Sequence, residues 1–121
     1  MKTVRDWVLL VDKLTELTQY NEIKWERNSA PSYLQSTISR VDFVYFVHFN
    51  NKLFRLYEET YKYYTDEDEY YWETQARLGL VDNLGNPIFD VPNTRNMHNL
   101  MQAVKYQSSD INSIFLVGKY S

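Results

Sequence analysis

Residues 52–82 read KLFRLYEETYKYYTDEDEYYWETQARLGLVD and contain the clearest structural pattern of the chain. On both sides of a polar centre at 65–68, aromatic and β-branched residues recur at every second position. This period places alternate side chains on opposite faces of an extended strand, and a polar run between two such segments is typical of a hairpin turn. The stretch therefore predicts a long two-stranded antiparallel ribbon that folds back at 65–68.

The same ribbon concentrates charge and tyrosine. Residues 58–73 contain seven acids and one base, Lys62, which gives a local charge of −6, whereas the other positions together carry +3. Clustered carboxylates steer basic partners, and tyrosine and tryptophan are enriched at interface hot spots. We therefore expect a partner-binding surface at the end of the ribbon. Its predicted residues are Tyr63, Tyr64, Asp66, Glu67, Asp68, Glu69, Tyr70, Tyr71 and Trp72.

The segments around the ribbon alternate between helical and extended patterns. We expect helices at 3–19, 95–106 and from Ile111 to Val117, and further strands at 22–27, 33–39, 41–49 and 87–91. Turns are expected at 28–31, at Asn50 and Asn51, and at 83–86, because asparagine and glycine tolerate positive φ. Strands that run together between helices indicate an α+β fold. The prediction is one domain over 1–121, with an antiparallel meander of five or six strands, an N-terminal helix and two C-terminal helices on one face of the sheet.

The sequence also predicts how two helix ends are capped and which side chains share one face of a strand. Asn21 is expected to end the first helix in the left-handed conformation, and Asn93 or Thr94 to cap the second. In the strand at 41–49, alternation predicts one face shared by Val41, Phe43, Tyr45, Val47 and Phe49.

The residues that carry most enzyme chemistry are missing or scattered. The chain has no cysteine, only three glycines, and two histidines, His48 and His98, that are fifty positions apart. Metal sites, nucleophile elbows and phosphate loops each need particular residues at short, fixed spacings, and none of these spacings occurs. The acids at 66–69 lack the glycine and terminal glutamate of a calcium loop. We expect no catalytic residue, no metal and no cofactor, and hence a non-enzymatic protein.

Charge and hydropathy also bear on partners and location. A net charge of −3 gives no basic footprint for direct nucleic-acid binding. No apolar run approaches the roughly 18 residues that a membrane span needs, and Asp6 and Asp12 interrupt the first apolar segment. We expect a cytoplasmic protein that binds neither membrane nor nucleic acid directly.

The acidic ribbon also has other interpretations. It can be a solvated hairpin end, in which tyrosines pack across strands and acids protect an edge. A nucleotide-like small molecule can be held by aromatic and arginine side chains, here Trp25, Trp72, Arg55 and Arg77, unless the two arginines pair with Glu59 and Glu73 instead. A third alternative is self-association into a homo-oligomer through the ribbon or a sheet edge.

Short motifs at both ends of the chain resemble a loose group of small bacterial and prophage proteins. The opening has Leu14 and Thr15 followed by Ile23 and Trp25, and the closing part has 78–82 with Gly85 before the last helices. The group has no assigned activity, so the resemblance implies a phage or mobile-element accessory protein and no site residues. Combined with the acidic ribbon, it leads us to expect a protein that engages a basic, nucleic-acid-binding partner, such as a host defence nuclease.

Overall fold

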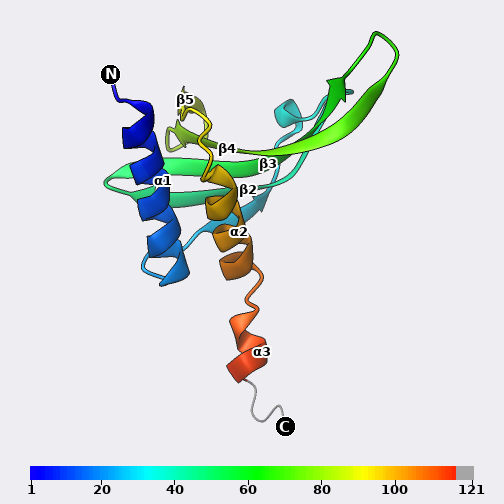
Figure 1. The fold of residues 1–121 in the computed structure, drawn as a ribbon. Coiled ribbons are helices and arrows are strands. Elements are labelled where there is room, and N and C mark those ends of the chain that lie inside the picture. The colour runs from blue at the N-terminus through cyan, green and yellow to red at the C-terminus, as the bar shows by residue number, and fades with distance from the viewer. Residues whose placement is uncertain (117–121) are drawn as a thin grey trace.

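One antiparallel sheet, with its strands in the order β1-β2-β3-β4-β5, organises the chain (Figure 1). The computed structural model describes residues 1–116. The elements are α1 (Val4–Gln19), β1 (Glu26–Ser29), the 3-10 helix η1 (Ser32–Leu34), β2 (Ser39–Phe49), β3 (Lys52–Tyr64), β4 (Tyr70–Val81), β5 (Pro87–Asp90), α2 (Met97–Ser108) and α3 (Asn112–Leu116). This architecture confirms the predicted α+β meander. Val117, which was predicted to belong to the last helix, lies outside the described residues.

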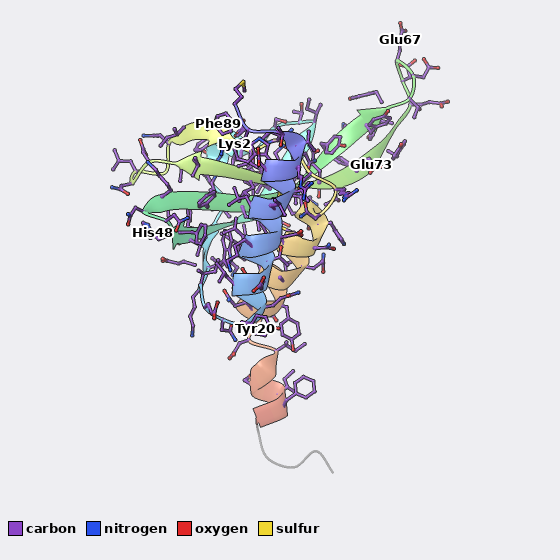
Figure 2. All side chains as sticks on the ribbon, turned by 60° about the vertical axis from the view of Figure 1, so that its left-hand side comes forward. Lys2, Tyr20, His48, Glu67, Glu73 and Phe89 are labelled. Atoms are coloured by element: carbon purple, nitrogen blue, oxygen red, sulfur yellow. The ribbon has the colours of Figure 1, made fainter. Side chains whose placement is uncertain are left out.

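The predicted ribbon is the hairpin β3–β4. Its pairing runs without a register shift from Leu53 opposite Val81 to Tyr64 opposite Tyr70. In the turn, the Thr65 N–H donates to the Glu69 carbonyl at 2.9 Å. Figures 1 and 2 show that the hairpin continues well past the part that the helices cover, with Glu67 at its far end.

The helices α1 and α2 bury one face of the sheet. This core combines helix and strand residues, namely Val11, Leu14, Tyr45, Val47, Phe54, Leu56, Leu78, Leu100, Met101 and Val104. Each large apolar side chain buried there contributes about 1.5–3 kcal/mol to stability. At one end of the layer, the Trp7 ring stacks on Phe89, with centroids 5.7 Å apart, and so joins α1 to β5. Figure 1 shows α3 continuing beyond this layer.

Local signals at the turns and at α1 behave as their chemistry predicts. Asn50 and Asn51 adopt φ of 50° and 62° between β2 and β3, and Asn21 adopts φ of 57° after α1. At the start of α1, the Asp6 N–H donates to the Thr3 hydroxyl and the Asp6 carboxylate accepts from the Thr3 N–H, which forms a capping box.

The predicted strand at 22–27 is wrong, because β1 lies at Glu26–Ser29 and so includes part of the predicted turn at 28–31. The backbone before it is bound by a side chain of α2 instead of a neighbouring strand. The Gln107 amide donates to the Ile23 carbonyl at 2.8 Å and accepts from the Trp25 N–H at 2.8 Å. Ile23 and Trp25 still pack against the core, as their apolar character requires.

The predicted strand at 33–39 is also wrong. After Pro31, the chain forms η1 and then an irregular loop. The Gln35 side chain takes the place of a neighbouring strand, since it accepts from the Val41 N–H and donates to the Val41 carbonyl. The Ser36 hydroxyl accepts from the Ser39 N–H at 3.0 Å and tightens the loop before β2.

A bulge in β2 overturns the single face predicted for Val41, Tyr45 and Val47. The pairing with β3 shifts register between Val41 and Val44, which lie opposite Glu59 and Tyr57 respectively. Glu59 and Tyr57 point to the same side of β3, which is the side away from the helices. Val41 lies opposite Glu59, so it lies on that side as well. The extra residue in a bulge reverses the alternation that a simple count assumes.

The second helix begins at Met97, after the predicted Arg95, and its N-cap is Asn96 in place of Asn93 or Thr94. The Asn96 side chain does not cap its own helix. Its amide donates to the Val8 carbonyl at 2.9 Å and to the Asp12 carboxylate at 2.7 Å, which fastens α2 to α1. The tertiary contact therefore takes the side chain that local capping would have used.

We expect Gln107→Leu to lower the free energy of unfolding by about 2 kcal/mol, because the Trp25 N–H and Ile23 carbonyl lose their partner. Urea denaturation measures this change. Gln102→Leu, on the exposed side of the same helix, is the matched control and should change stability by about 0.5 kcal/mol or less. Equal effects of the two substitutions would contradict the role of Gln107.

Candidate functional site

The outer half of the β3–β4 hairpin carries five exposed aromatic side chains. Their exposed fractions lie between 46% for Tyr70 and 52% for Trp72, with Tyr63, Tyr64 and Tyr71 in between. In the pairing of β3 with β4, Tyr63 lies opposite Tyr71 and Tyr64 opposite Tyr70, and Trp72 lies next to Tyr71 on β4. The structure therefore brings together the aromatic residues that the sequence assigned to a binding surface. We call this segment, residues 61–73, the outer ribbon.

Both faces of the outer ribbon are aromatic. On one face the Tyr64 and Tyr70 rings lie 5.5 Å apart, and Trp72 meets Tyr70 edge-on at 6.1 Å. The Lys62 ammonium lies over Tyr70 on this face, 4.4 Å from the ring centroid. On the other face the Tyr63 and Tyr71 rings lie 5.3 Å apart. Cross-strand aromatic contacts of this kind stabilise a strand pair and restrict the positions of the rings.

The turn at the end of the ribbon is acidic and exposed. Asp66, Glu67, Asp68 and Glu69 are all exposed, and Figure 2 shows Glu67 far from the body and Glu73 part-way back along the hairpin. The Asp66 carboxylate accepts from the Glu67 N–H at 2.6 Å and helps to form the turn. Within residues 1–116, the four acids of the turn form no ion pair.

Two further acids near the base of the ribbon are neutralised by the fold. Lys105 on α2 contacts Glu58 at 2.6 Å, and Arg77 contacts Glu59 at 3.4 Å. These pairs reduce the local charge of residues 58–73 from −6 to −4. The negative charge that remains is concentrated at the turn and at Glu73.

Arg55 has a role that the sequence did not indicate. Its side chain is 5% exposed on the face away from the helices, where Nη1 donates to the Tyr33 hydroxyl at 2.7 Å. Its guanidinium carbon lies 5.2 Å from the Tyr57 ring centroid, and Nε is buried without an acceptor among the described residues. Arg55 thus attaches the loop containing η1 to the sheet and does not pair with Glu73. Of the two arginines expected to pair with Glu59 and Glu73, only Arg77 forms such a pair, and its partner is Glu59.

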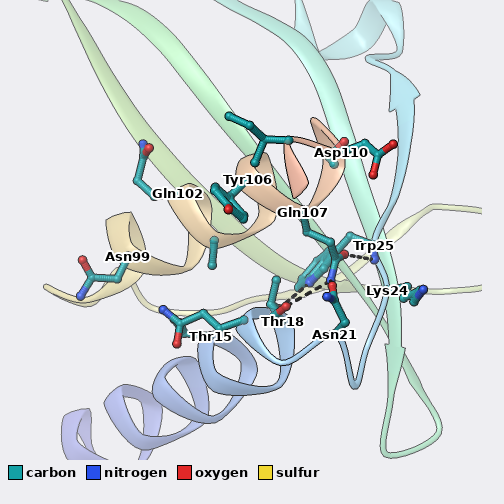
Figure 3. A pocket seen from close by; sticks show the side chains of 14 residues that line it. Thr15, Thr18, Asn21, Lys24, Trp25, Asn99, Gln102, Tyr106, Gln107 and Asp110 are labelled. Atoms are coloured by element: carbon teal, nitrogen blue, oxygen red, sulfur yellow. Dashed lines mark hydrogen bonds between the residues drawn. The ribbon is translucent and has the colours of Figure 1, made fainter. Parts of the chain in front are cut away.

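The four residues proposed for a small-molecule pocket do not converge. Trp72 contacts Tyr70 on the outer ribbon, Arg55 contacts Tyr33 of η1, and Trp25 borders a groove between the C-terminal half of α1 and the length of α2. Figure 3 shows this groove, of about 960 Å³, with polar side chains such as Thr15, Asn99 and Gln102 along its walls. The Trp25 indole N–H donates to the Thr18 hydroxyl at 2.9 Å at its base.

Residues 1–116 contain neither a cluster of metal ligands nor a membrane-spanning helix. No group of three or more His, Asp or Glu side chains in residues 1–116 is arranged to hold a metal ion. His48 on β2 and His98 on α2 are both exposed and belong to separate elements. No helix among the described residues has the length and apolar character needed to cross a membrane.

Comparison with protein families, with curated proteins and with solved structures finds no match to this chain.

Tyr71 should titrate above the ordinary tyrosine pKa of about 10. Partial desolvation is the main cause of its raised pKa, and the neighbouring carboxylate of Glu73 adds to it. A raised pKa means that folding favours the neutral phenol, so this contribution to stability is present below pH 10 or so and is lost as the pH rises through the folded pKa.

We expect Glu73→Gln to lower the pKa of Tyr71 without returning it to the ordinary value, because desolvation persists. An NMR titration of the tyrosine ring carbons measures the change. Glu26→Gln, on β1 and away from the ribbon, is the control and should leave Tyr71 unaltered. A Tyr71 pKa that does not move in Glu73→Gln would contradict the assigned electrostatic contribution.

Proposed function

We propose that this protein is a non-catalytic binding protein whose outer ribbon engages a partner with a basic surface. One observation carries the proposal, which is that five half-exposed aromatic side chains occupy both faces of a hairpin that projects past its own core and ends in four acids. An exposed aromatic cluster of this kind is typical of a protein–protein interface.

The aromatic contacts support binding through preorganisation. The rings of Tyr63 and Tyr71 pack against each other across the strands, and so do those of Tyr64 and Tyr70. These rings already have restricted rotamers, so they lose little conformational freedom when a partner covers them. Loss of side-chain freedom is one of the main costs of association. A hairpin with aromatic residues on both faces is also suited to insertion into a groove, where both faces are covered.

The charge distribution supports the choice of a basic partner. The acids of the turn are unpaired among the described residues, whereas Glu58 and Glu59 are held by Lys105 and Arg77. The unpaired carboxylates therefore lie at the projecting end of the ribbon, where they accelerate association with a positively charged surface. Carboxylates presented along a projecting ribbon can occupy the positions that phosphates take in a nucleic-acid-binding groove. We propose that the partner is a basic, nucleic-acid-binding protein. A host defence nuclease that is bound by a phage accessory protein is one example.

Capture from bacterial lysate on immobilised protein, followed by elution with a salt gradient, tests the proposal. We expect a basic protein to be retained by the wild type and to be lost with the triple variant Glu67→Lys, Asp68→Lys, Glu69→Lys. Asp66 is left unchanged because its carboxylate helps to form the turn. With the purified partner, the variant should associate at least about tenfold more slowly at low salt and show a weaker dependence on salt.

The matched control reverses three exposed acids elsewhere, with Glu16→Lys, Glu22→Lys and Glu26→Lys. Because this variant has the same net charge as the ribbon variant, it separates local steering from a change in total charge. Association equal to that of the wild type is expected. Equal affinity of wild type and ribbon variant for the captured partner would rule out the acidic turn as the steering element.

The aromatic surface can be tested separately. Tyr70→Thr combined with Trp72→Thr removes the rings and places β-branched residues, which favour strands, at these positions, so we expect partner dissociation to accelerate by about a hundredfold or more while the fold is retained. Surface plasmon resonance measures dissociation, and circular dichroism checks the fold. Tyr20→Thr, an exposed tyrosine next to α1, is the control.

A further inference from the structure

The outer edge of β4 is open over most of its length. The short strand β5 pairs only with Gly79, Leu80 and Val81, and the Val91 N–H then donates to the Leu78 carbonyl at 2.9 Å. From Tyr70 to Arg77, β4 pairs with β3 alone among the described residues. Figure 1 shows β5 beside the end of β4 that is farthest from the turn.

The hydrogen bond from the Val91 N–H to the Leu78 carbonyl also shows in which direction the unpaired backbone groups of β4 point. In an antiparallel strand, alternate residues turn both their N–H and their C=O groups to the same side. The Leu78 carbonyl points to the outer edge, and the pairing of β3 with β4 has no register shift. The backbone groups of Ala76, Thr74, Trp72 and Tyr70 therefore point outward as well. They form a row of donors and acceptors about 20 Å long, at about 3.4 Å per residue.

Glu73 is the only charged side chain that protects this edge between residues 70 and 76 against strand pairing. Proteins shield exposed edges with short strands, prolines, lysines or bulges. The two outermost strands of this sheet, β1 and β5, have four residues each, and β5 begins with Pro87. In contrast, residues 70–76 read YYWETQA, with no proline, lysine or bulge.

We propose that the open edge of β4 binds an extended, basic segment of the partner protein as an added β-strand. This inference rests on the proposed function and specifies how the partner is held. A groove of about 380 Å³ lies beside this part of β4 and is lined by Thr74, Ala76, Asn93, Arg95 and His98 among others. Backbone pairing supplies the affinity, and pockets for alternate side chains supply the specificity.

Charge favours a basic segment over a second copy of this chain. If two copies paired along the full segment, Tyr70 would lie opposite Ala76 of the second copy and Glu73 opposite the same glutamate. Like charges directly opposite each other destabilise a strand pair. The two acidic turns would add to this repulsion, whereas lysine or arginine side chains near the turn complement it.

Amide hydrogen exchange of the full-length protein, followed by NMR, tests the inference. The probe is a nine-residue peptide in which lysine alternates with valine or threonine. In the free protein, the amides of Tyr70, Trp72, Thr74 and Ala76 should exchange rapidly, whereas those of Tyr71, Glu73 and Gln75 are protected by β3. With saturating peptide, we expect exchange at the four outward amides to slow by about tenfold or more, as new hydrogen bonds require. A peptide with glutamate in place of lysine is the control.

Thr74→Pro tests the same edge by a different route. The Thr74 N–H points outward, so proline removes no hydrogen bond to β3 and is tolerated as an edge residue. We expect this variant to bind the lysine peptide at least about tenfold more weakly, because it lacks one donor and places its ring against the incoming strand. Thr74→Ala keeps the N–H and should bind within about twofold of wild type.

The results of these experiments distinguish strand addition at β4 from the more general proposal that the outer ribbon binds a basic partner. Protection of the four outward amides, together with weak binding by Thr74→Pro only, supports strand addition. Peptide binding that shifts the Trp72 signals and requires the acidic turn, but leaves these amides unprotected, overturns strand addition and retains the proposed function. No peptide binding overturns strand addition, and the capture experiment then decides the proposed function. Outward amides that are protected in the free protein, with dimeric mass by light scattering, assign the edge to a second copy and overturn the inference.

Discussion

The continuous pairing of β3 with β4 fixes the orientation of the side chains in the core and in the outer ribbon. Twelve consecutive residue pairs form without a bulge, so one alternation sets the facing of every side chain along the hairpin. At the inner end this alternation directs Leu56 and Leu78 toward α1 and α2. A one-residue slip would move these side chains to the opposite face and expose the core. The same register places Tyr64 beside Tyr70 at the outer end, so the core and the aromatic outer ribbon are aligned by one set of hydrogen bonds.

The two ends of this hairpin are stabilised in different ways. The inner end is buried beneath two helices, which are themselves joined by Asn96 and linked to the chain before β1 by Gln107. The outer end has no layer on either face and relies on cross-strand ring contacts and on the turn. Apolar burial therefore supplies most of the free energy of folding at one end, whereas the other end contributes little and leaves its aromatic surface accessible.

Local patterns were sufficient to predict the features that depend on local chemistry. The hairpin, its turn, the Asn50 and Asn51 connection and the first helix all follow from alternation, helical spacing or tolerance of positive φ. The aromatic residues of the outer ribbon were identified in the same way, because residues on facing strands near a turn must lie close together. The errors occur where a distant side chain replaces a local partner. Trp25 is bound by a residue 82 positions away, and Arg55 by Tyr33, 22 positions away.

Neither interaction has a periodic signature, so no count along the chain could have found them. The bulge in β2 belongs to the same class, since one extra residue reverses the facing of Val41 without any change in composition. The prediction of Asn93 or Thr94 as the N-cap of α2 failed for a related reason, because the helix begins after Asn96, whose side chain binds the neighbouring helix.

The separation of the outer ribbon from the core has a consequence for how this protein can evolve. Most of the chain is constrained by packing, and changes there are limited by the loss of stability that they cause. Residues 61–73 are largely outside that constraint, since they contact few residues beyond their own hairpin. Substitutions in this short segment can change the exposed aromatic and acidic surface while the scaffold stays the same, in the way that exposed loops on rigid frameworks vary in sequence.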